Sequence, residues 1–476
     1  MIERLFFELM QVAVGTRSSL SRVMTNKEWE GVYVCCLKQT LVGMGYVAIQ
    51  KLPKAQWPPS DVVLKFTAMA TRIKSRNELL DKTCVAVCQR MDHDGLDAVI
   101  LKGQANSINY PETLRPYRMP GDIDVWARPK GNGVIPIASK TGNNNVEYID
   151  YSGVQAVIEY VRMQYRIKGS SDRPPMRYHH IDAPPVDGIP VEVHFRPSYK
   201  NSPIRNWRMQ NWYKTRMDIC IKNKCCLGFP VLTSSINVVF LMDHLFRHYF
   251  VEGLGLRQLM DYYFALRLWH NDVMECKDLQ SQGIWSEGLG TPVMSKEEVM
   301  AVLRSFGMAK FAAAVMYVLQ EAFENEECLL ELEMRNEILG IERELKEINR
   351  ELKEIGPQAD DRSERECLQI YSHIANIKKS SSSSASFREF KKNIFAPWMI
   401  CEPNEKEGRK LLEEIMQGGN FGQYDSRDAA LKKGGMMKHG VWKLKRVMRL
   451  VSSYPEEALW EPVFRVYHLV WRKING

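Results

Sequence analysis

Residues 101–126, LKGQANSINYPETLRPYRMPGDIDVW, place Asp122 and Asp124 two positions apart in a strand-like run. Side chains at positions i and i+2 of a β-strand point to the same face, so the two carboxylates are expected side by side. Adjacent carboxylates resist joint ionisation, and a bound divalent cation removes that conflict. Because hard oxygen ligands suit Mg²⁺ or Mn²⁺, the pair predicts a metal site, although this spacing alone is a weak signal.

Other acidic and basic side chains extend this candidate site. The segment VEVH places Glu192 between two valines, which predicts a third carboxylate on another strand. His194 is expected on the same face as Glu192, either as a base or hydrogen-bond donor near an acceptor or as an ordinary structural histidine. Triphosphate needs basic side chains as well as metal, and three cations lie shortly before the acidic pair: Lys102, Arg115 and Arg118.

Hydrophobic periodicity divides the chain into five parts. Residues 1–93 are predicted to be an N-terminal helical region, and 94–215 an α+β core. Residues 216–323 and 387–476 return to helical periodicity and are predicted to be one C-terminal helical region in two pieces. In the second piece, Pro462 is expected in the first turn of the last helix, where proline is tolerated.

Within the core, apolar runs at 98–101 and 122–126 predict strands, and the pattern at 153–165 predicts a helix. The segments RYHHIDA and IPVEVHFRP flank the turn-rich PPVDG at 184–188, which predicts a β-hairpin.

The fifth part, residues 324–386, differs in composition from its surroundings. Apolar residues recur at alternating steps of four and three, at Met334, Ile338, Ile341, Leu345, Ile348, Leu352 and Ile355. This heptad seam is interrupted at 356–357, resumes up to Ile377, and ends before a run of serines at 380–384 that is typical of a flexible linker. The pattern predicts an inserted helical hairpin, paired with itself or self-associating through residues 334–377.

Composition limits the class of protein. Hydrophobic residues make up 45% and charged residues 26%, which is ordinary for a globular protein, and no run approaches the roughly 18 uncharged apolar residues of a membrane span. The N-terminal stretch carries charges within its apolar run, unlike a signal peptide, so a cytoplasmic location without membrane partners is expected. The net charge of +8 permits an anionic partner but is too small for a dedicated DNA binder.

Two groups of potential zinc ligands allow a second interpretation. Cys220, Cys225 and Cys226 form the only tight cysteine group in the sequence, without a second pair at ligand spacing, so ordinary thiols are favoured. His244 and His248 lie one helical turn apart, but the glutamate of a zinc-protease motif is absent, which favours a structural pair.

Together these motifs resemble a known superfamily. An apolar strand, a glycine turn, Asp-x-Asp on the next strand and a later acid between apolar residues is the layout of the DNA polymerase β-type nucleotidyltransferases. More narrowly, LKG…Y…R…GDIDVW, VEVHFRP, DHLFRH and LRQLMDYY are similar to an uncharacterised bacterial group of nucleotidyltransferase family proteins. The resemblance covers most of the chain outside residues 324–386.

This resemblance implies a polymerase β-like nucleotidyltransferase core with a mixed sheet, flanked by the two helical regions and interrupted by the hairpin insertion. It implies an enzyme that moves a nucleoside monophosphate from a nucleoside triphosphate to an acceptor hydroxyl, releasing pyrophosphate. Asp122, Asp124 and Glu192 would then hold Mg²⁺ or Mn²⁺, and the chain after Gly103 would approach the phosphates. The acceptor stays open between a small molecule, a saccharide, RNA and protein.

The sequence departs from the superfamily at the phosphate turn. Lys102-Gly103-Gln104 stands where the superfamily has Gly-Ser or Gly-Gly. The interpretation is that Lys102 or Arg118 replaces the missing phosphate contacts. Two alternatives to a nucleotidyltransferase stay open for the whole sequence: an Asp-x-Asp glycosyltransferase, and a non-catalytic nucleotide-binding or interaction protein.

Overall fold

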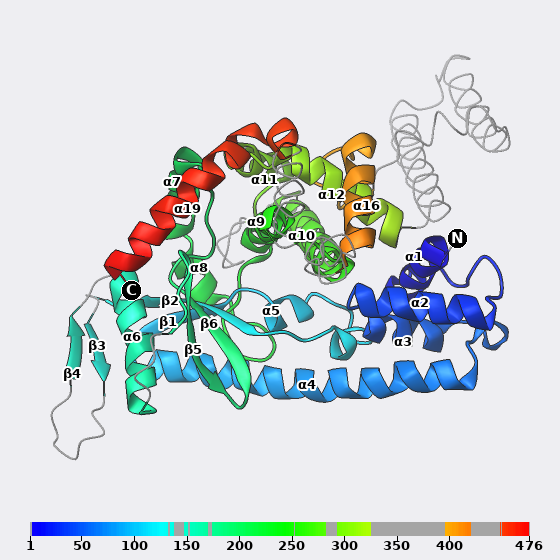
Figure 1. The fold of residues 1–476 in the computed structure, drawn as a ribbon, viewed down its shortest axis with the longest axis horizontal. Helices are drawn as coiled ribbons and strands as arrows, with labels where there is room; N and C mark the ends of the chain where they lie inside the picture. Colours follow the sequence, from blue (N-terminus) through cyan, green and yellow to red (C-terminus); the bar gives the residue numbers. More distant parts are fainter. Residues whose placement is uncertain are drawn as a thin grey trace, which may run out of the picture.

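The computed structural model describes residues 2–131, 134–137, 147–150, 153–169, 174–251, 253–281, 293–324, 396–419, 448 and 450–475. These residues form a mixed α+β fold that is mostly helical (Figure 1). The predicted hairpin insertion, with its heptad seam and serines, lies outside the described residues beyond Glu324. Among the described residues, no helix combines the length and apolar character needed to cross a bilayer.

The N-terminal region consists of helices, as predicted. They are α1 (Ile2–Val14), α2 (Asn26–Lys38), α3 (Val42–Lys51), η1 (Lys54–Gln56) and α4 (Ser60–His93). Helix α4 is one element of 34 residues, because its apolar residues recur at helical spacing and no proline interrupts it. Val62 and Phe66 pack in one hydrophobic cluster with α1–α3, and Leu80, Cys84 and Val87 pack in a second cluster under the sheet. Figure 1 shows α4 running from the N-terminal helices to the sheet.

The core contains a four-stranded sheet in the order β1-β2-β6-β5. Its strands are β1 (Leu96–Ile100), β2 (Ile123–Pro129), β5 (His180–Val186) and β6 (Ile189–His194). Strands β1 and β2 are antiparallel, β2 and β6 are parallel, and β6 and β5 form the predicted hairpin. A separate two-stranded sheet pairs β3 (Val134–Ile137) with β4 (Glu147–Asp150).

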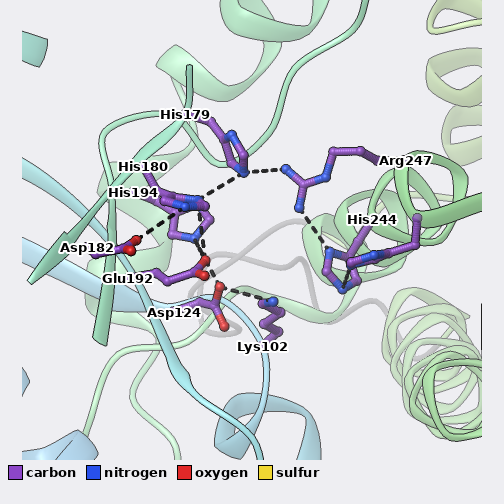
Figure 2. Close-up of polar contacts among 10 residues, drawn as sticks. Lys102, Asp124, His179, His180, Asp182, Glu192, His194, His244 and Arg247 are labelled. Carbon is purple, nitrogen blue, oxygen red and sulfur yellow. Dashed lines mark hydrogen bonds and ion pairs between the residues drawn. The ribbon is translucent and has the colours of Figure 1, made fainter. Parts of the chain in front are cut away.

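The sheet has one apolar face and one polar face. Ile123, Val125, Val191 and Val193 pack against α4 and against α6 (Val154–Ile167), the helix predicted at 153–165. Because side chains alternate along a strand, Asp124, Glu192 and their same-face neighbours point the other way. That opposite face lies toward α9 (Ser234–Val251), which supplies the side chains that complete the site (Figure 2).

The C-terminal region is helical, in agreement with the sequence prediction. Its described helices are α8 (Met217–Lys222), α9, α10 (Leu256–Ser281), α11 (Lys296–Ser305), α12 (Ala309–Phe323), α16 (Glu405–Gly418) and α19 (Pro455–Asn475), and α7 (Pro203–Lys214) lies before it, at the end of the predicted core. Helix α12 contacts α1, and both contribute to the same hydrophobic cluster, so the two helical regions share one core. The expected position of Pro462 was wrong: α19 already begins at Pro455, which places Pro462 inside the helix.

Candidate functional site

Acidic side chains on the polar face stand in a row across three neighbouring strands. Asp124 of β2 is paired in register with Glu192 of β6, and Glu192 is paired with Asp182 of β5. Two positions further along β6 lies His194, which is in register with His180 of β5. Carboxylates directly opposite each other repel, so this row has an electrostatic cost that a cation would relieve.

Asp124 is fully buried and lies between His194 and Lys102 (Figure 2). Its Oδ1 atom is 3.1 Å from Lys102 Nζ and 3.0 Å from His194 Nε2. Its Oδ2 atom is buried without a hydrogen-bond partner among the described residues. An orphaned carboxylate oxygen between other acids fits a site for a divalent cation.

The turn after β1 brings Lys102 to Asp124. The backbone N–H of Leu101 donates to the Asp124 carbonyl at 2.9 Å, which holds the two segments together. Gly103 has a φ of +67°, and a Cβ there would lie 3.2 Å from the Asp122 carbonyl oxygen, so glycine suits this turn. The short helix α5 (Gln104–Ser107) follows directly.

The charges in this cluster shift one another's pKa values. Burial alone would lower the pKa of His194, but its hydrogen bonds to Asp124 and Glu192 raise the pKa overall. Burial opposes ionisation of Glu192, yet His194 and Lys102 lower its pKa below the ordinary value. Burial likewise opposes the charge on Lys102, whose pKa is nevertheless raised by Asp124 and Asp122. Lys102 and Glu192 are therefore charged at neutral pH.

Asp122 stands apart from the other two predicted metal ligands. Among the described residues, Asp124, Glu192 and His194 each offer a ligand atom within 4.8 Å of the others, and Asp122 is not in that group. Asp122 precedes β2 and lines the adjoining cavities together with Lys102. The structure thus brings Asp124, Glu192, His194 and Lys102 into contact and leaves Asp122 at the rim.

A chain of histidines and arginine extends from this cluster to α9. His180 Nδ1 is 3.3 Å from Glu192 Oε2 and 3.2 Å from His179 Nε2. Arg247 of α9 contacts His179 Nε2 at 2.5 Å through Nη1 and His244 Nδ1 at 3.3 Å through Nη2. Burial, His194 and Arg247 lower the pKa of His180 to about 2, so this imidazole is neutral and its ring can act as a ligand.

The two zinc alternatives gain no support from the geometry. His244 and His248 contact each other at 3.1 Å between their Nε2 atoms, as a structural pair would. In the part of the chain that the structure describes, neither they nor any cysteine belongs to a group of three potential ligands, and Cys220, Cys225 and Cys226 are free thiols.

Arg118 has a partner of its own. Its Nε and Nη2 atoms each lie 2.7 Å from a different carboxylate oxygen of Asp261 on α10, and Tyr110 donates a hydrogen bond to Asp261 at 2.7 Å. The Arg118 side chain is only 2% exposed. Arg115 lies further out, 3.8 Å from Asp81. Of the three predicted cations, only Lys102 contacts the acidic row.

Two cavities adjoin Lys102 and Asp122. The first, called the Arg257 cavity, has a volume of about 280 Å³. Its lining includes Lys102, Gly103, Arg118, Asp122, Arg257 and Asp261. The second, called the His180 cavity, has a volume of about 160 Å³. Its lining includes Lys102, Asp122, His180, Glu192, Tyr199 and Arg247. A larger cavity of about 670 Å³ between α7 and α19 contains none of the predicted site residues.

Arg257 was not singled out from the sequence. Its Nε atom is buried without a hydrogen-bond partner among the described residues, and burial and the nearby Arg118 lower its pKa. A buried cation in this state is stabilised by an incoming anion. The sequence signal was present in LRQLMDYY, where Arg257 lies one helical turn before Asp261 on α10.

Comparison with known protein families gives one match. The model of a family described as uncharacterised nucleotidyltransferase matches residues 25–283, which include β2 with Asp124, β6 with Glu192, and α9. No curated protein and no solved structure matches the chain.

Proposed function

Because the chain belongs to the uncharacterised nucleotidyltransferase family, a family of enzymes, we propose that it transfers a nucleoside monophosphate from a nucleoside triphosphate. The acceptor oxygen forms a bond to the α-phosphorus, the bond to the bridging oxygen breaks, and pyrophosphate leaves. The acceptor hydroxyl loses its proton, for which His194, beside Asp124 and Glu192, is the candidate base. The acceptor itself is a small molecule, saccharide, RNA or protein.

The observation that carries the proposal is the pairing of Asp124 with Glu192 on adjacent parallel strands, within 4.8 Å of each other and of His194. The orphaned Oδ2 of Asp124 adds an oxygen ligand. This donor set fits Mg²⁺ or Mn²⁺, with Asp122 as a further ligand from the rim. When bound, the cation would supply charge stabilisation at the phosphates and activation of the acceptor oxygen.

The Arg257 cavity is the proposed phosphate site. Lys102, Gly103 and Asp122 line it, and Lys102 also contacts Asp124, so a triphosphate there would lie beside Lys102 and Asp122. Arg118 also lines the cavity, but Asp261 already neutralises its charge. Arg257 Nε has no such hydrogen bond to any described residue, and we therefore assign it the larger share of phosphate binding.

The polymerase β-like character of the core is part of this proposal. It is supported by the mixed sheet and by the acids on its parallel pair. The division into residues 1–93, 94–215, 216–323 and 387–476, with an insertion at 324–386, remains a proposal on the same footing.

Nucleotide binding tests the phosphate site. Fluorescent nucleoside triphosphate and monophosphate would be titrated against the wild type and against Lys102→Ala, Arg118→Ala and Arg257→Ala. A charge-assisted phosphate contact is worth about 1.5–3 kcal/mol, so loss of Lys102 or Arg257 should weaken triphosphate binding about ten- to a hundredfold and monophosphate binding much less. Equal, small effects on both ligands would contradict the assignment.

Turnover tests the chemistry. Each nucleoside triphosphate, radiolabelled at the α-phosphate, would be incubated with the protein, Mg²⁺ or Mn²⁺ and fractionated cell extract as acceptor. Transfer of label should require the divalent cation and disappear in Asp124→Asn. Asp187→Asn, which changes an exposed acid in the β5–β6 turn, is the matched control and should retain transfer. Transfer that survives Asp124→Asn would contradict the proposed site.

One observation favours a second candidate, a non-catalytic nucleotide-binding protein. Lys102 Nζ lies 3.1 Å from Asp124 Oδ1, where an ammonium group can replace a metal ion as counter-charge. If the protein only binds nucleotide, excess chelator should leave triphosphate binding unchanged. If it is the proposed enzyme, triphosphate binding should weaken when the divalent cation is removed.

A further inference from the structure

The acidic row continues beyond the residues that the proposed chemistry uses. Asp124 and Glu192 belong to the proposed nucleotide-transfer site, but Asp182 lies on the far side of Glu192, in register with it across the β5–β6 pair. The Asp182 side chain is 42% exposed, and the Glu192 side chain is 27% exposed. The row is therefore buried at Asp124 and opens toward solvent at Asp182.

A direct cationic contact lies at the buried end of this row. Lys102 Nζ contacts Asp124 Oδ1, and His194 Nε2 lies between Asp124 and Glu192, at 3.0 and 3.5 Å. At the open end, His180 Nε2 lies 3.6 Å from Asp182 Oδ1.

The ligand atoms at this end have the spacing of a cation site. Among the described residues, His180, Asp182 and Glu192 each offer one ligand atom within 4.8 Å of the other two, and all three come from the β5–β6 hairpin. In an ion with bonds of about 2.1 Å, neighbouring ligand atoms lie about 3 Å apart and opposite ones about 4.2 Å apart. The contact of His180 Nδ1 with Glu192 Oε2 at 3.3 Å falls in this range.

We propose that His180, Asp182 and Glu192 form a second divalent cation site, with Glu192 shared between it and the Asp124 site. One imidazole nitrogen with two carboxylates favours first-row transition ions such as Mn²⁺ or Zn²⁺ over Mg²⁺. His180 and Glu192 line the His180 cavity, so an ion there has open coordination positions that face the cavity. Neither nucleotide binding nor transfer is needed for this ion to bind.

Metal binding by the full chain, measured without nucleotide, tests this site. Free Mn²⁺ would be followed by electron paramagnetic resonance during titration of wild type, Asp182→Asn, His180→Gln and Asp124→Asn. We expect two bound ions in the wild type and one in Asp182→Asn and in His180→Gln. The control Asp187→Asn, in the turn of the same hairpin, should bind as the wild type does.

A spectroscopic signature identifies the histidine ligand. Bound Mn²⁺ should show nitrogen hyperfine coupling, and in Asp124→Asn the remaining ion should keep a coupling that His180→Gln removes. Asp182 is partly exposed, so Asp182→Asn tests the site even if His180→Gln fails to fold. The proposal would be overturned if the wild type binds at most one ion and Asp182→Asn still binds it. Two ions bound to Asp182→Asn would also overturn it. A single ion that is lost in Asp182→Asn but kept in Asp124→Asn would support this site and count against the Asp124 site alone.

Discussion

Replacing Arg118 by methionine removes the cation from a buried ion pair that joins the core to α10. The methionine keeps much of the side-chain volume but leaves the Asp261 carboxylate with the Tyr110 hydroxyl as its remaining donor from this group. Two charge-assisted hydrogen bonds of 2.7 Å are lost, each worth about 1.5–3 kcal/mol. Breaking a buried pair on one side typically costs about 3–5 kcal/mol, and we expect Arg118→Met to lower the free energy of unfolding by that amount.

Urea unfolding, followed by tryptophan fluorescence, measures this loss. The matched control is Arg465→Met, which removes an exposed arginine paired with Glu461 on α19 and should cost less than about 1 kcal/mol. In a double-mutant cycle, Arg118→Met and Asp261→Leu should each destabilise the protein. Their combination should cost at least about 2 kcal/mol less than the sum, because neither charge is then left unpaired.

Two results would refute this reasoning about Arg118. The first is a cost for Arg118→Met no larger than that of Arg465→Met. The second is additivity of the two changes in the cycle, because it would mean that Arg118 and Asp261 do not depend on each other. A structural role of this size also requires that any nucleotide titration of an Arg118 variant be made under conditions in which the variant is shown to be folded.

Three further outcomes follow from other parts of the fold. Gly43→Ala should destabilise the protein by about 1–3 kcal/mol in urea unfolding, because a Cβ there collides with the Tyr117 carbonyl. Gly418→Ala should not, because no atom of the described residues lies within 4 Å of the added Cβ, and equal effects would count against close packing of α3. Burial, then His248 and Lys102, hold the pKa of His244 well below its ordinary value. The unfolded chain therefore takes up a proton near pH 6.5 that the folded protein excludes, and stability should fall as the pH drops below that value. His244→Gln should reduce this slope by up to about 1.4 kcal/mol per pH unit, and an unchanged slope would show that His244 is protonated in the fold. Mn²⁺ at a hundred times the dissociation constant of a site should stabilise the protein by about 2.7 kcal/mol for each occupied site, so Asp124→Asn, which keeps the His180, Asp182 and Glu192 ligands, should gain about 2.7 kcal/mol less than the wild type. An equal gain in the two proteins would argue against ion binding at Asp124.

Local periodicity was enough to predict most of the elements that position the site. The stripe on α4 and the alternation in GDIDVW and VEVH depend only on which face of an element is buried. The same alternation put Asp124 and Glu192 each on the face opposite to the apolar residues of its own strand, and the register of β2 and β6 pairs the two acids. Pairings between distant segments were not accessible in this way. Arg118 and Asp261 are 143 residues apart, and nothing in either local sequence announces their contact.

The omission of Asp182 has a specific cause in the β5–β6 hairpin. Strand pairing begins at Val186 with Ile189, and continued one residue at a time it would place Asp182 opposite Val193, on the core face. A register shift between Ala183 and Val186 places Asp182 opposite Glu192 instead. Bulges change the face on which later residues lie, and the prolines at 184–185 were the available signal, since proline cannot donate to the ladder.

The packing of helix α4 at both of its ends limits where residues can be inserted into or deleted from this chain. At about 1.5 Å per residue, its 34 residues span about 51 Å, and opposite ends of the helix belong to different hydrophobic clusters. Inserting one residue midway would rotate the Leu80–Met91 half by about 100° relative to the Val62–Phe66 half, so that only one end could keep its apolar stripe buried. The helix thus fixes the distance between the N-terminal helices and the sheet that bears Asp124. Insertions and deletions can accumulate in the loops on either side of α4, whereas the number of residues in α4 is fixed because both of its ends must stay packed.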